Sequence, residues 1–242
     1  MTRRRLIDVA AGAGLLTALI VAMAVPPEQT QGELARLMFV HVPSAWLAYL
    51  AFAVTLAGSG AYLWWRSARW DRMAAASAEV GVFFTGAALL SGMIWGKPTW
   101  GVWWTWDARL VLTAAMFFVY LGYLALRRSI IDPEARARRA AVYGMLAVVM
   151  IPLVHFSVVW WRTLHQPPSI LRPGPMQLDP PFFAGLLVAL VAFTLVYLAL
   201  VGRRMQLARL EERIEERLGA AERAVAGAAV APPHWEELGE HV

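Results

Sequence analysis

Apolar residues occur along this chain in six long runs, separated by short stretches rich in charged residues, Pro and Gly. Each run has about the 20 residues that a helix needs to cross the hydrocarbon core of a bilayer. None of them alternates like a barrel strand, and a lipid-facing backbone must satisfy its own hydrogen bonds, so we expect helices. The pattern predicts an all-α, polytopic membrane bundle of six transmembrane helices. The runs are Leu6–Val25, Ser44–Trp65, Met73–Ile94, Leu110–Leu126, Ala140–Val159 and Pro181–Val201.

The composition supports this class and excludes several others. Hydrophobic residues make up 59% of the 242 residues and charged residues only 16%, and the mean hydropathy is +0.52. Soluble domains carry about 25% charged residues, so neither a water-soluble globule nor a disordered chain fits. Cysteine is absent, which excludes disulfides, thiolate metal ligands, iron–sulfur clusters and haem attached through cysteine.

The basic residues predict how the chain is oriented in the membrane. Of the 22 Lys and Arg residues, 17 fall before the first run or after the second, fourth and sixth. Positive charge marks cytoplasmic segments, so we expect both termini in the cytoplasm. The loops after the first, third and fifth runs are then outside, which is the periplasm in a two-membraned bacterium. The formal net charge of +5 reflects this topology, and no nucleic-acid partner is expected.

The two ends of the chain leave alternatives open. Arg3–Arg5, the first run and Ala22–Ala24 also fit a cleaved signal peptide, which would leave the remaining topology unchanged. We expect a six-span domain over residues 1–202 and a cytoplasmic segment over residues 203–242. Apolar residues at three-to-four spacing predict an amphipathic helix in that segment, on the membrane, against a partner helix or as a plain extension of the last span. These residues are Leu207, Leu210, Ile214 and Leu218, and disorder is expected after Ala231.

Small residues and one carboxylate stand out inside the third run. The pairs Ser77/Gly81 and Ala88/Gly92 are spaced so that a neighbouring helix can approach closely. Glu79 lies near the cytoplasmic end of the run. We expect it to reach water or to pair with an Arg, and we leave it out of the candidate site.

The outer loop over residues 95–109 contains five of the twelve tryptophans within twelve positions. An aromatic belt at the membrane surface explains one or two per helix end. Five favour a surface for a large, flat, apolar ring system, because aromatic rings stack on it. Gly96, Pro98 and Gly101 are expected to break the helix here. Asp107 fits an N-cap of the fourth span, while Lys97 and Arg109 are candidates to meet ligand carboxylates.

Two histidines on the same predicted outer face indicate which ring system binds. His41 lies just before Pro43, at the first turn expected for the second span, and His165 lies in the last outer loop. Two imidazoles can ligate one haem iron axially. His155 is a weaker candidate near the outer end of the fifth span. His234 and His241 lie in the tail and are expected to be idle.

These residues resemble the tryptophan-rich WWD signature of haem-handling proteins in cytochrome c maturation. The signature reads Trp95-Gly-x-x-x-Trp100-Gly-x-Trp103-Trp104-x-Trp106-Asp107-x-Arg109-Leu110. The flanking segments Phe39-Val-His41-Val-Pro43 and Trp160-Trp161-x-x-Leu-His165-Gln are similar to the histidine segments of the CcmC-like members. The resemblance covers about residues 1–200, and nothing is carried over to the longer tail.

The resemblance implies a protein of the bacterial inner membrane that holds haem b transiently at the periplasmic surface. It implies delivery to the haem chaperone CcmE, work with the transporter parts CcmA and CcmB and with CcmD, and no catalytic residue. His41 and His165 would be the axial ligands. The haem-contacting residues would be Trp100, Trp103, Trp104, Trp106 and Asp107, joined by Arg109 as a carboxylate partner.

Other functions remain possible from the sequence alone. The chain has no phosphate-binding P-loop, but it fits a permease-like subunit of an ABC-type haem exporter. A haem lyase acting directly on apocytochrome is a second alternative. An electron-carrying b-type cytochrome would need buried pairs of histidines, for which only His155 is a candidate, and a purely structural subunit would bind no haem.

Overall fold

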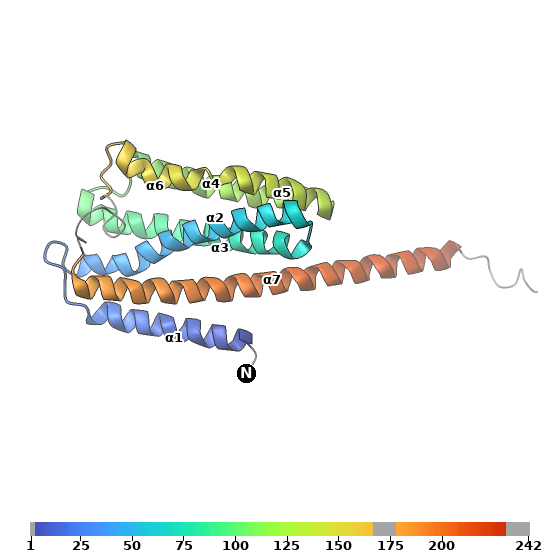
Figure 1. Cartoon of the computed structure of the whole chain (residues 1–242), viewed down its shortest axis with the longest axis horizontal. Helices are drawn as coiled ribbons and strands as arrows, with labels where there is room; N and C mark the ends of the chain where they lie inside the picture. Colours follow the sequence, from blue (N-terminus) through green and yellow to red (C-terminus); the bar gives the residue numbers. More distant parts are fainter. Residues whose placement is uncertain (1–2, 167–177, 231–242) are drawn as a thin grey trace, which may run out of the picture. The chain divides into compact units, whose positions relative to one another are not determined.

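The computed structural model describes residues 3–166 and 178–230, and most of these residues are helical (Figure 1). Six helical segments within them are long and apolar enough to cross a membrane, which confirms the prediction of an all-α polytopic bundle. Strand pairing in these two ranges is limited to one isolated bridge between Glu28 and Gly32. The elements are α1 (Arg3–Ala24), the 3-10 helix η1 (Glu33–Leu37), α2 (Met38–Trp65), α3 (Ala68–Trp100), α4 (Ala108–Ser129), α5 (Pro133–Ala147), α6 (Met150–Trp160) and α7 (Pro180–Val230).

The chain divides into two compact units, Met1–Arg203 and Arg204–Val242. The second unit is helical as far as Val230, and Arg204 pairs with Glu211 within it at 3.2 Å. The apolar residues that predicted an amphipathic helix there are exposed: Leu207, Leu210, Ile214 and Leu218. His234, His241 and the stretch after Ala231 lie outside the described residues.

The centre of the first unit is built from α2, α3, α4 and α5. Ser77 donates a hydrogen bond to the carbonyl of Ala51 at 2.6 Å, so side chains of α3 satisfy backbone groups of α2. A core cluster includes Phe52 of α2 stacked on Tyr120 of α4, with ring centroids 3.4 Å apart. Small residues let these helices approach closely, as the pairs in the third run predicted.

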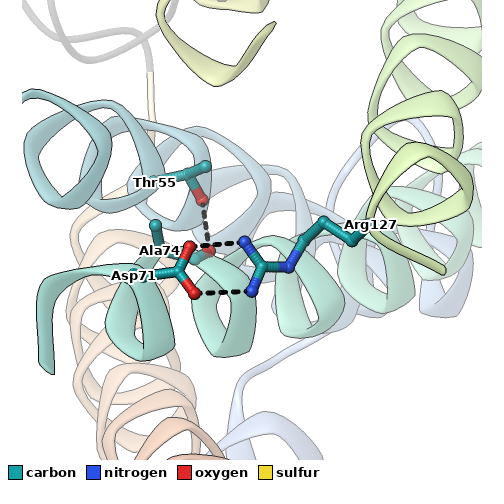
Figure 2. Close-up of polar contacts among 4 residues, drawn as sticks. All are labelled: Thr55, Asp71, Ala74 and Arg127. Atoms are coloured by element: carbon teal, nitrogen blue, oxygen red, sulfur yellow. Dashed lines mark hydrogen bonds and ion pairs between the residues drawn. The ribbon is translucent and has the colours of Figure 1, made fainter. Parts of the chain in front are cut away.

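An ion pair joins α3 to α4 at the end of the bundle opposite to the tryptophan-rich segment. Arg127 donates two hydrogen bonds to the Asp71 carboxylate, at 2.5 and 2.7 Å. Beside it, the Thr55 hydroxyl donates to the carbonyl of Ala74 at 3.3 Å (Figure 2). Both charged side chains are 14% exposed, so the charges neutralise each other where water is scarce.

The first span packs against α7. Ala18 and Val25 of α1 share a core cluster with Leu186 and Ala189 of α7. At the other end of α1, Asp8 pairs with Arg203 at 3.1 Å. Helix α1 therefore contacts α7 near both of its ends.

The second and fifth spans differ from their predicted bounds. Helix α2 begins at Met38, before the predicted start at Ser44, and so includes His41: Met38 and Phe39 are buried, and their packing keeps the chain helical ahead of Pro43. The fifth span begins at Pro133 and is broken into α5 and α6 at Val148 and Val149. Pro152 explains this break, because it has no N–H for the carbonyl of Val148 and crowds that carbonyl.

Candidate functional site

The predicted site residues gather at one end of the first unit, where α2 and α4 begin and α3 and α6 end (Figure 1). His41 comes from α2, Arg109 from the first turn of α4 and His165 from the segment after α6. The three side chains are close enough to interact electrostatically with one another. Two imidazoles that are far apart in the sequence thus come from elements at the same end of the bundle.

His41 is held in place through Nδ1. This nitrogen lies 3.0 Å from the carbonyl oxygen of Ala88 and 3.2 Å from the Ser91 hydroxyl, both on α3. The edge of the Trp95 ring packs against the imidazole, with centroids 5.8 Å apart and planes at 81°. Donation from Nδ1 to a carbonyl fixes the tautomer and leaves Nε2 as the nitrogen with a lone pair, which is the usual arrangement of a metal-ligating His.

His165 is oriented in the same way from a different element. Its Nδ1 lies 2.8 Å from the carbonyl oxygen of Gln166, and Thr163 donates its hydroxyl to the carbonyl of His165 at 3.0 Å. Burial lowers the pKa of His165, the nearby charge of Arg109 lowers it further, and the Gln166 carbonyl and Asp107 act against this. A lowered pKa favours the neutral imidazole, which is the form that binds a metal.

Arg109 interacts electrostatically with both histidines and is anchored to α6. Its Nη1 donates to the carbonyls of Val154 at 2.9 Å and His155 at 3.2 Å. The guanidinium is thereby bonded to two carbonyls in the middle of α6, and its positive charge acts on both imidazoles. A carboxylate of a bound ligand would find its counter-charge here.

The tryptophan-rich segment is more helical than expected. Helix α3 continues through Gly96 and Pro98 to Trp100 and ends at Gly101, whose φ is 80°. The expected helix break at Gly96 and Pro98 is wrong, because Pro98 lies in the last turn and its missing bond affects one carbonyl only. Lys97 donates to the carbonyl of Gly101 at 2.8 Å and so caps its own helix.

The tryptophans do not form one flat surface. Trp100 lies against Gly96 of its own helix. Trp104 and Trp106 meet edge to face with centroids 6.0 Å apart, and the side chains of Trp103 and Trp106 are 55% and 86% exposed. The Trp104 indole nitrogen is buried without a hydrogen-bond partner in the described part of the chain. An orphaned donor beside exposed indoles fits a ligand with a flat ring and acceptor groups.

Asp107 begins α4, as predicted for an N-cap. Its Oδ1 accepts the backbone N–H of Leu110 at 3.0 Å. Its Oδ2 accepts the Thr105 hydroxyl at 3.2 Å and the backbone N–H of Leu164 at 3.4 Å. The carboxylate is therefore occupied by protein groups from the segment before α4, from α4 itself and from the segment after α6.

The residues that support His41 are not predicted by the sequence pattern. Trp95 was read only as part of the signature, although it packs on the imidazole and donates to Gln31 at 2.7 Å. Gly92 was read only as a packing residue, although a Cβ there would lie 3.0 Å from Cε1 of His41. The available signal was the spacing of Ala88, Gly92 and Trp95 along one face of a helix. His155 instead packs edge to face with Tyr49, at 6.2 Å.

The residues present fit a haem better than a simple metal ion. Across residues 3–166 and 178–230 there is no group of three His, Asp or Glu side chains that would hold a metal ion. A porphyrin brings four of the iron ligands itself, so two imidazoles suffice. These features define a polytopic α-helical membrane protein with an imidazole- and indole-lined site at one end of its bundle.

Comparison with known proteins identifies the family. The model of the CcmC family, heme exporter protein C, matches residues 2–219, and the chain belongs to this family. A "Heme exporter protein C" of Bradyrhizobium diazoefficiens is 44% identical over 175 residues, which are 72% of this chain and 66% of that protein. The protein of the same name from Haemophilus influenzae is 36% identical over 198 residues, or 81% and 79% of the two chains.

A third relative comes from a plant. A "Putative cytochrome c biosynthesis ccmC-like mitochondrial protein" of Marchantia polymorpha is 36% identical over 162 residues, which are 66% of this chain and 68% of that protein. Membership of this family agrees with the resemblance that the WWD signature indicated.

Proposed function

We propose that this protein holds haem b at the periplasmic face of the bacterial inner membrane and delivers it to the haem chaperone CcmE. The proposal is supported by the electrostatic interaction of His41 and His165 with each other and with Arg109, together with the hydrogen bond that joins the His165 segment to the start of α4. Each imidazole has its Nδ1 next to a backbone carbonyl, so each has Nε2 available for the iron. The two nitrogens would be the axial ligands.

The residues around the histidines would hold the porphyrin. The exposed rings of Trp103 and Trp106 offer faces for stacking, each worth about 0.5–1.5 kcal/mol beyond burial. The orphaned indole nitrogen of Trp104 and the guanidinium of Arg109 suit the propionate groups. Trp100 and Asp107 would support the haem-binding residues. Trp100 would do so by packing on Gly96, and Asp107 by joining the segments that contain Thr105 and Leu164.

The open character of the site suits delivery. The rings of Trp103 and Trp106 are exposed at the end of the bundle, so a bound haem would keep an edge accessible to a partner. Holding that edge in one orientation lowers the entropic cost of the bond that the chaperone forms. The chain acts as a scaffold within an assembly with CcmA, CcmB and CcmD, and the arginine distribution supports cytoplasmic termini and a periplasmic site.

Absorption spectra of the full-length protein in detergent, loaded with hemin, test the ligand assignment. The wild type is expected to show six-coordinate, low-spin haem with two imidazole ligands. His41→Ala and His165→Ala should each lose this spectrum and most of the haem. His155→Ala is the matched control and should retain both. Unchanged haem content and an unchanged axial-ligand spectrum in the first two variants would overturn the assignment.

A transfer assay tests delivery and separates it from the alternatives. Haem-loaded protein is mixed with purified CcmE, and haem on each protein is followed over time. Transfer to CcmE supports the proposal. Haem transport into vesicles by this protein with an ATPase, or direct attachment of haem to apocytochrome without CcmE, would instead identify an exporter subunit or a lyase.

A further inference from the structure

The segment that carries His165 is connected to the bundle through Asp107. Residues 161–166 follow the end of α6, and two hydrogen bonds there are internal: Thr163 to the carbonyl of His165, and Nδ1 of His165 with Gln166. The hydrogen bond from the backbone N–H of Leu164 to Oδ2 of Asp107 links the segment to the start of α4. Leu164 is the residue directly before His165.

Asp107 itself is fixed by its place in the fold. One carboxylate oxygen caps α4 through Leu110, and the other accepts from Thr105 and Leu164. The carboxylate also interacts electrostatically with His165. Arg109, two residues further on, donates to the carbonyl of Val154 in α6. The start of α4 therefore contacts both α6, which precedes the segment that contains His165, and the segment itself.

We propose that Asp107 is a positioning residue: it holds the His165 segment so that the imidazole can share one iron with His41, and it does not contact the haem. This inference rests on the proposed function. A ligand on a short irregular segment binds well only when its orientation is set beforehand, since ordering the segment on binding costs conformational entropy. Mutation of residues that orient a metal ligand without binding the metal typically lowers metal affinity by about 10–100-fold.

The variant Asp107→Ser separates capping from positioning. Serine is a good N-cap, but it has one side-chain oxygen and cannot accept from both Leu110 and Leu164. In the full-length protein titrated with hemin, we expect haem affinity to fall about ten-fold and the spectrum to shift from low-spin toward five-coordinate, high-spin haem. Added imidazole should restore the low-spin spectrum by taking the place of the His165 side chain.

Two further comparisons guard against a folding defect. Thr105→Val removes another hydrogen bond to Asp107 and leaves the one from Leu164, so its spectrum should match the wild type. Leu164→Pro removes the N–H itself and should behave like Asp107→Ser, whereas Leu164→Ala keeps it and should behave like the wild type. If Asp107→Ser does not accumulate in the membrane, the comparison of Leu164→Pro with Leu164→Ala decides whether the hydrogen bond to Asp107 positions His165.

The spectra of the wild type and of Asp107→Ser test the positioning role of Asp107 separately from the proposed binding of haem by two histidines. A wild type without a two-imidazole spectrum overturns both. A wild type with that spectrum and an identical Asp107→Ser overturns the positioning role alone. A six-coordinate but weakly bound haem in Asp107→Ser, unaffected by imidazole, also overturns it, because that result identifies Asp107 as a direct haem contact.

Discussion

The imidazole of His41 lies against Gly92, so closely that a Cβ atom on Gly92 would come within 3.0 Å of Cε1 of His41. One turn earlier on the same helix, the carbonyl of Ala88 lies 3.0 Å from Nδ1. The glycine thus leaves the space that the ring occupies, and the carbonyl sets the ring's orientation. Both features belong to α3, whereas the histidine belongs to α2.

The first prediction is that Gly92→Ala weakens haem binding. The added methyl group must displace the imidazole by a few tenths of an ångström and strain its bond to Ala88. We expect a haem affinity about ten-fold lower in a hemin titration, as is typical when the hydrogen bond that orients a ligating histidine is disturbed. Gly60→Ala is the control, because no atom lies within 4 Å of the added Cβ. Equal affinities of the two variants would contradict the prediction.

The second prediction concerns the contact between α2 and α3. A Cβ on Gly81 would lie 2.8 Å from the Cβ of Ala51 and 2.7 Å from Cε1 of Phe52. We expect Gly81→Ala to lower the free energy of unfolding in detergent by about 1–3 kcal/mol, as overpacking does. Gly86→Ala on the same helix meets Phe117 at an ordinary 3.4 Å. Its unfolding should match the wild type more closely, and the reverse order would refute the packing argument.

The third prediction concerns the ion pair between Asp71 and Arg127. Arg127→Ala leaves a carboxylate that is 14% exposed without its counter-charge. We expect a loss of about 3 kcal/mol in the free energy of unfolding, the lower end for a buried pair that loses one partner. Arg138 is exposed, so Arg138→Ala should stay within about 0.5 kcal/mol of the wild type. Similar losses in both variants would show that the pair is not the cause.

The fourth prediction concerns the hydrogen bond between the hydroxyls of Ser77 and Tyr197, 2.7 Å apart, which joins α3 to α7. A double-mutant cycle with Ser77→Ala and Tyr197→Phe isolates this contact. We expect a coupling of about 0.6 kcal/mol, the average for hydrogen bonds between membrane helices. Thermal unfolding of the four proteins measures it, and strictly additive losses would rule it out.

The number of helices was predictable because it depends on a local property. A run of about 20 apolar residues becomes a spanning helix wherever it occurs, so six runs gave six spans. The bounds were less predictable, because they depend on contacts with other helices. Met38 and Phe39 extend α2 in front of Pro43 because they are buried by residues from distant parts of the chain. The break near Val148 did have a sequence signal in Pro152, which was overlooked.

The candidate site stays a prediction, and the sequence predicts it only as a set of residue types. Clustered tryptophans with His41 and His165 indicated a flat, iron-containing ligand, and the N-cap role of Asp107 followed from its position before an apolar run. The supporting residues were not predictable. Nothing in the sequence pairs His41 with Ala88, or Asp107 with Leu164, because these contacts span 47 and 57 residues.

The sequence by itself therefore determined the class of protein, the count of spans and the chemistry available at one end of them, because hydropathy and residue type act locally. Only the tertiary structure decided that the two imidazoles come from different elements and interact with one arginine. It also decided that α3 provides the glycine and the carbonyl that hold His41, and that one carboxylate joins the segment before α4 to the segment after α6. These are properties of helix packing, which places side chains by the fit of distant surfaces.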